Sequence, residues 1–75
     1  MTEIVFLAEE APEGGFTARA VGESIFTEAD DEAALREMVR DAVRCHFPGE
    51  QTRPRVILLH WVRDEAVGAR RIVPG

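Results

Sequence analysis

One group of carboxylates in this chain has the residue types of a metal-dependent nuclease. Glu28, Asp30, Asp31 and Glu32 lie almost consecutively. Two-metal chemistry needs several acids that converge on a pair of cations from separate strands and a helix. Consecutive residues point in different directions and do not converge in this way. Asp30 or Asp31 can instead be the N-cap of a helix that begins here, where a carboxylate interacts favourably with the helix dipole. We therefore interpret the cluster as a helix start and expect no catalytic residues.

Cys45 and His46 form the second group, with the types of a nucleophile and its base. Adjacent residues of a helix project about 100° apart, so this pair does not form a hydrogen-bonded dyad. Cys45 is expected to be a small buried apolar residue. No ligand spacing joins the pair to His60, and the chain has no phosphate-binding glycine loop. We expect no metal, no cofactor and no enzymatic activity.

The spacing of apolar residues predicts the elements that position these groups. Strands are expected at Ile4–Ala8, Phe16–Ala20, Ile25–Glu28 and Arg55–Val62, with a helix from about Glu32 to Cys45 or His46. Gly14 and Gly15 supply the positive φ angles of a tight turn. The chain is thus an α+β domain of order β-β-β-α-β. Whether the last strand lies opposite or between the earlier strands is left open.

The predicted helix carries one apolar stripe, which is expected to lie on the sheet. Its members recur at helical spacing: Leu35, Met38, Val39, Ala42 and Val43. Pro48 and Gly49 end the helix. One flank carries Arg36, Arg40 and Arg44, which could meet an acidic partner or phosphates. We expect instead a solvated flank on which Glu37 and Asp41 pair with Arg40 and Arg44.

Two segments carry a resemblance to a known family. Glu13-Gly14-Gly15-Phe16-Thr17-Ala18 and Ala29-Asp30-Asp31-Glu32-Ala33-Ala34 resemble the HicB-like antitoxin domain, over roughly residues 2–62. The turn from Ala20 to Ser24 is shorter than the Pro-x-Leu-Pro-Gly-Cys stretch of typical members. The resemblance implies a truncated RNase H-like sheet with one helix on one face.

The resemblance also implies a function. HicB-like antitoxins bind and neutralise HicA, a small mRNA-cleaving toxin with a double-stranded-RNA-binding fold. Many members carry a C-terminal DNA-binding module, and the residues after Val62 are too few for one. We therefore expect a stand-alone domain at residues 1–63, a short tail at 64–75 and no direct contact with nucleic acid. The alternative is an oligomeric structural or adaptor protein of the same fold without a toxin partner.

Charge is distributed unevenly along the chain, whose net charge is -5. Residues 1–32 hold nine carboxylates and one arginine, and residues 33–75 hold five carboxylates and eight arginines. An acidic half suits a basic partner such as a HicA-like toxin. We expect that partner to meet loop carboxylates, namely Glu9, Glu10, Glu13 and Glu23. The alternative is that these carboxylates only solvate the turns.

Both faces of the first and last strands are apolar, although one helix can cover only one face. An apolar sheet face left in water is rare in soluble monomers. We therefore expect a homodimer or higher oligomer that uses the outer sheet face or an open strand edge. The predicted interface residues are Val5, Leu7, Phe26, Leu58 and Trp61.

Size and composition fix the remaining expectations. The 75 residues include a single cysteine, so no intrachain disulfide stabilises this one small domain. The apolar run Val56–Leu59 is too short to span a bilayer, so no membrane contact is expected. One free thiol and no recognisable signal peptide favour a cytoplasmic location.

Overall fold

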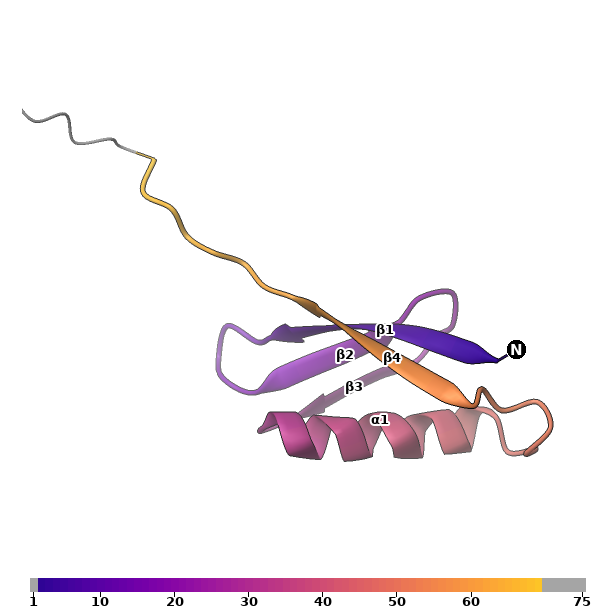
Figure 1. Ribbon diagram of the computed structural model, residues 1–75. Helices are drawn as coiled ribbons and strands as arrows, with labels where there is room; N and C mark the ends of the chain where they lie inside the picture. The colour runs from indigo at the N-terminus through magenta and orange to yellow at the C-terminus, as the bar shows by residue number, and fades with distance from the viewer. Residues whose placement is uncertain (1, 70–75) are drawn as a thin grey trace, which may run out of the picture.

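The structure is a computed structural model that describes residues 2–69. Its elements follow the order β1 (Glu3–Glu10), β2 (Phe16–Ala20), β3 (Phe26–Ala29), α1 (Glu32–His46) and β4 (Val56–Val62). A single sheet carries α1 on one face (Figure 1). The predicted α+β class and β-β-β-α-β order are confirmed.

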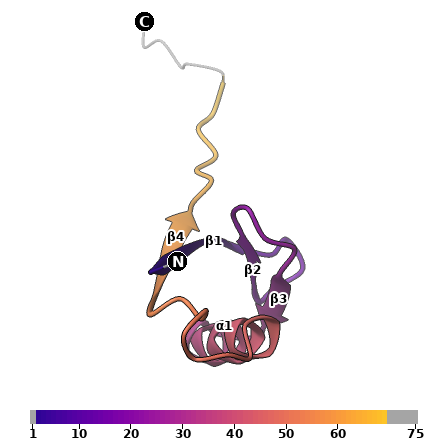
Figure 2. The same ribbon diagram turned by 90° about the vertical axis from the view of Figure 1, so that its right-hand side faces the viewer.

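The sheet has four strands in the order β3-β2-β1-β4. β1 pairs antiparallel with β2, and β2 pairs antiparallel with β3. β4 pairs parallel with β1, because α1 carries the chain back to the end of the sheet where β1 begins. Figure 2 shows the sheet curving around the face that α1 covers. The position that the sequence left open for the last strand is therefore an edge of the sheet.

The helix begins where the carboxylates predict. Asp31 is the N-cap, and its Oδ1 accepts a hydrogen bond of 2.7 Å from the backbone N–H of Ala34. At the other end, the N–H of Phe47 donates to the carbonyl of Val43, and Pro48 follows. Asp31 is thus the capping residue of the two candidates, and its carboxylate is used for helix geometry.

The core lies between α1 and the inner face of the sheet. Its buried members are Ile4, Phe6, Ala8, Ala18, Ile25, Leu35, Val39 and Val43. Alternate residues of β1 supply one side of the core, and every fourth residue of α1 supplies the other. Two expectations were wrong. Met38 lies off the buried stripe with 45% of its surface exposed. Cys45 is exposed, because it projects about 200° around the helix from the buried Val43.

Two glycines shape the turn from β1 to β2. Gly14 and Gly15 have φ angles of 103° and 81°, as the turn requires. A Cβ on Gly15 would lie only 2.8 Å from the backbone carbonyl oxygen of Ala29 on β3. Gly15 therefore allows two backbone segments to approach closely, in addition to permitting the turn.

The predicted boundaries of three strands shift by one or two residues. β1 extends through Glu10, so Glu9 and Glu10 are strand residues rather than loop residues, held in register with Thr17 and Phe16. β3 begins at Phe26 and β4 at Val56, each one residue later than expected. Residues 63–69 form neither helix nor strand and run away from the sheet (Figure 1), while the rest of the predicted tail lies outside the described residues.

Candidate partner-binding surfaces

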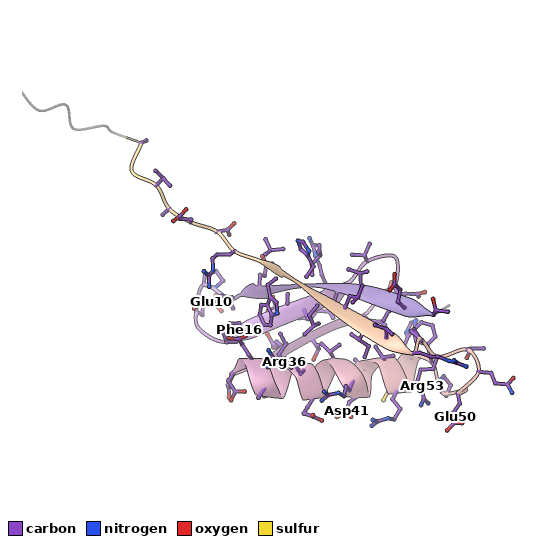
Figure 3. All side chains as sticks on the ribbon, viewed as in Figure 1. Glu10, Phe16, Arg36, Asp41, Glu50 and Arg53 are labelled. Carbon is purple, nitrogen blue, oxygen red and sulfur yellow. The ribbon has the colours of Figure 1, made fainter. Side chains whose placement is uncertain are left out.

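A cleft of about 510 Å³ opens at one end of the sheet. β1 and β4 end there, and β2 and α1 begin there. Its lining residues are Glu9, Glu10, Ala11, Pro12, Phe16, Glu32, Trp61, Val62, Arg63 and Asp64. Four of these carry a carboxylate and one carries a guanidinium. We call this surface the acidic cleft. Figure 3 shows two of its residues, Glu10 and Phe16, at the end of the sheet nearest the start of α1.

Two aromatic rings from different strands meet in the acidic cleft. The rings of Phe16 and Trp61 lie edge to face, with centroids 5.8 Å apart and planes at 89°. Phe16 pairs with Glu10 in the sheet, and Trp61 pairs with Ala8. All four residues are therefore on the helix-covered side of the sheet. The cleft combines an aromatic surface with a carboxylate rim, and such a combination suits a cationic side chain.

The four carboxylates that the sequence predicts to bind a partner lie on two separate surfaces. Glu9 and Glu10 line the acidic cleft, and Glu13 lies exposed in the turn that follows them. Glu23 lies in the turn between β2 and β3, at the opposite end of the sheet. Its Oε2 is 3.2 Å from Nε2 of His46 at the end of α1. Glu23 therefore does not share a surface with the other three.

Sequence reasoning missed part of the acidic cleft. Glu32 and Asp64 complete the carboxylate rim, and Phe16 lies beside Trp61. Glu32 comes from the first turn of α1 and Asp64 follows β4, so only the parallel pairing of β4 with β1 brings them together. The sequence feature that could have indicated Glu32 was the surplus of acids in the first 32 residues, to which Glu32 belongs.

The outer face of the sheet is the second candidate surface. Phe26 is 64% exposed and Leu58 is 44% exposed, while Val5 and Leu7 are half-buried beside them. This face is turned away from α1 (Figure 2). Trp61 was nominated with these four residues, but the structure places it on the opposite face against Phe16. The odd-even alternation of β4 explains the difference, since Leu58 and Trp61 are an odd number of residues apart.

The basic flank of α1 is paired with its own acids, as expected. Arg40 pairs with Glu37, and Arg44 pairs with Asp41 at 3.0 Å. Glu32 lies 3.7 Å from Arg36. Figure 3 shows Asp41 on the side of α1 turned away from the sheet. These pairs are exposed, so each contributes little to stability, and they leave little unpaired positive charge for phosphate contacts.

The carboxylates near the start of the helix lie in different places and have different contacts. Asp31 caps α1, and Glu32 is near Arg36. Glu28 alternates with the buried Thr27 and therefore lies on the outer face of the sheet. Within residues 2–69, no group of three or more His, Cys, Asp or Glu side chains is arranged to hold a metal ion.

Within the same described range, no helix has both the length and the apolar character needed to cross a membrane.

Comparison with known proteins places the chain among small proteins of similar length. It is 53% identical over 53 residues to a UPF0150 protein of Archaeoglobus fulgidus, a match that covers 71% of this chain and 77% of that protein. It is 38% identical over 65 residues to a UPF0150 protein of Thermotoga maritima, covering 87% of this chain and 90% of that protein. No family model and no solved structure matches the chain. At this identity and coverage, the chain belongs to the UPF0150 family.

Proposed function

We propose that this protein is a non-catalytic interaction domain that binds and neutralises a HicA-type mRNA-cleaving toxin. The observation that carries the proposal is the acidic cleft, where the carboxylate residues Glu10, Glu32 and Asp64 line the same space as Phe16 and Trp61. The resemblance of the sequence to HicB-like antitoxins supports the same assignment.

The chemistry of the acidic cleft explains how neutralisation works. A protein that cleaves RNA needs a basic surface to hold the phosphates of its substrate. Carboxylates such as Glu10 and Glu32 compete with those phosphates for the same Arg and Lys side chains. Trp61, which is 37% exposed and lies beside Phe16, adds cation–π contact for a guanidinium that lies over its ring. The domain therefore inhibits by covering the RNA-binding surface of the toxin.

Binding and RNA protection test the proposal together. The purified protein is mixed with a HicA-type toxin encoded in the same genome, and cleavage of a labelled mRNA is followed as the protein is titrated. We expect cleavage to stop near one domain per toxin and a complex to elute in size-exclusion chromatography. Cleavage at the full rate with an excess of domain would refute the proposal.

The outer face supports a second candidate function, a stand-alone oligomeric adaptor of the same fold. Phe26 and Leu58 are exposed there, on the face of the sheet opposite to α1. In this case the protein self-associates and no toxin binds. A HicA-like reading frame next to the gene favours the first function, and the failure of every basic toxin tested to bind favours the second.

A further inference from the structure

One edge of the sheet is open and unusually apolar. β4 is the terminal strand next to β1, and its sequence Val56–Val62 contains no Pro, no Lys and no acid. Val56, Leu58, Trp61 and Val62 are all between 37% and 47% exposed. Natural proteins protect such edges with charges, prolines, bulges or short strands, because an unprotected edge pairs with other chains.

The opposite edge shows the protection that β4 lacks. β3 has only four residues, one of which is Glu28, and Asp30 follows directly. α1 contacts β3 and β2 along their inner side. Beside β4 there is instead a groove of about 240 Å³, lined by Arg36, Val39, Arg40, Ile57, Leu59 and Trp61. The β3 edge is therefore shorter and more acidic than the β4 edge, and α1 packs closer to it.

Backbone hydrogen bonding identifies the groups that β4 offers at this edge. The N–H of Val56 donates to the carbonyl of Thr2, which turns the polar groups of Val56 toward β1. In a regular strand this direction alternates, so Leu58 and His60 also bond toward β1. The N–H and C=O groups of Ile57, Leu59 and Trp61 therefore point away from the sheet.

We propose that a second copy of this chain pairs its β4 antiparallel with this β4, about a two-fold axis at Leu59. This register opposes Ile57 to Trp61 of the second copy, and Leu59 to Leu59 of the second copy. All outward-pointing N–H and C=O groups of both strands are then used. The two sheets become one continuous sheet, and each edge is covered by its twin.

The sequence of β4 suits a copy of itself better than an unrelated peptide. Positions equally distant from Leu59 meet on the same sheet face, and two of the three pairs are apolar on both sides: Val56 with Val62 and Ile57 with Trp61, while Leu58 meets His60. A two-fold interface requires such self-complementarity. Strand addition supplies affinity through main-chain hydrogen bonds, and the alternate side chains supply specificity. The dimer forms without any toxin, so it does not depend on the proposed function.

Sedimentation equilibrium of the full chain at micromolar concentration tests the pairing. The variant Val56→Lys/Val62→Lys places like charges opposite each other twice across the two-fold axis. Each lysine also lies next to an acid on β1, since Val56 is in register with Glu3 and Val62 with Glu9. The variant therefore keeps its fold, which circular dichroism verifies. We expect a dimer for the wild type and a dimer dissociation constant at least about tenfold weaker for this variant.

Two further variants distinguish pairing at the β4 edge from association through the outer sheet face. Val56→Lys/Val62→Glu places opposite charges across the same axis, so we expect the dimer to return. Phe26→Lys adds one charge to the outer face at the β3 side, away from β4, and we expect it to leave the dimer intact. A monomeric wild type would overturn the proposal. Dissociation by Phe26→Lys, or a failure of the opposite-charge variant to restore the dimer, would overturn it as well.

Discussion

Phe16 and Trp61 touch across β1, although one residue opens β2 and the other lies near the end of β4. The contact is possible because the strand between them presents Ala8, which is fully buried and pairs with both Ala18 and Trp61. The small side chain of Ala8 leaves room for the two rings above it. This contact links β4 to β2 and forms the apolar part of the acidic cleft.

We predict that Phe16 and Trp61 are energetically coupled. In a double-mutant cycle with Phe16→Leu and Trp61→Leu, the coupling free energy should be about 0.5–1.5 kcal/mol, the range of edge-to-face aromatic pairs. Urea unfolding followed by far-UV circular dichroism measures the four stabilities. Strict additivity would mean that the rings stabilise the fold independently.

Gly15 and Gly22 form a matched pair for testing close backbone approach. Both have φ angles near +80°, but only Gly15 has a backbone atom in the way of a Cβ, the carbonyl oxygen of Ala29. We predict that Gly22→Ala destabilises by about 1 kcal/mol from the backbone angle alone. Gly15→Ala should cost at least about 1 kcal/mol more, because the β2–β3 pairing must shift. Equal losses in urea unfolding would show that the contact with Ala29 carries no cost.

Asp30 and Asp31 make a similar comparison at the helix start. Only Asp31 accepts the hydrogen bond from the N–H of Ala34. Asp31→Ala should therefore lower the free energy of unfolding by about 1 kcal/mol, the usual loss at an N-cap. Asp30→Ala should change it by less than about 0.5 kcal/mol, as for an exposed surface position. A larger effect at Asp30 would contradict the assignment of the cap.

The elements were predictable from the sequence wherever local signals decide them. The alternation from Phe16 to Ala20 gives β2 its bounds, and the capping acids followed by the stripe from Leu35 to Val43 give α1 its bounds. The exposure of Met38 was not predictable, because the part of the stripe that the sheet covers depends on how α1 packs on β2 and β3.

The acidic cleft was only half predictable, since it depends on pairing between distant segments. The surplus of early acids indicated Glu9 and Glu10, but their place in β1 follows from pairing with Thr17 and Phe16. The contribution of Asp64 depends on β4 joining the edge of the sheet parallel to β1. No local pattern in the sequence specifies that edge.

We predict that the pure protein does not cleave RNA in the presence of Mg²⁺ or Mn²⁺. Glu28 lies on the outer sheet face, Asp31 caps α1 and Glu32 is near Arg36, so these acids do not converge on one cation pair. Incubation of a labelled mRNA with the protein, with EDTA as the control, measures this. Metal-dependent cleavage that disappears in a folded Asp31→Asn variant would contradict the prediction.

Under the proposed function, the acidic cleft, and not acidity in general, binds the basic toxin. Two variants test it by stopped-flow association with a HicA-type toxin: Glu9→Lys/Glu10→Lys at the cleft, and Glu23→Lys/Glu50→Lys elsewhere on the surface. Both change the net charge by the same amount, so general attraction falls equally in the two. We expect the cleft variant to associate at least about tenfold more slowly at low salt and to lose most of its salt dependence, and the other variant to stay within about threefold of wild type. Equal slowing by both variants would show that the acids act only through net charge and that the cleft is not the binding site.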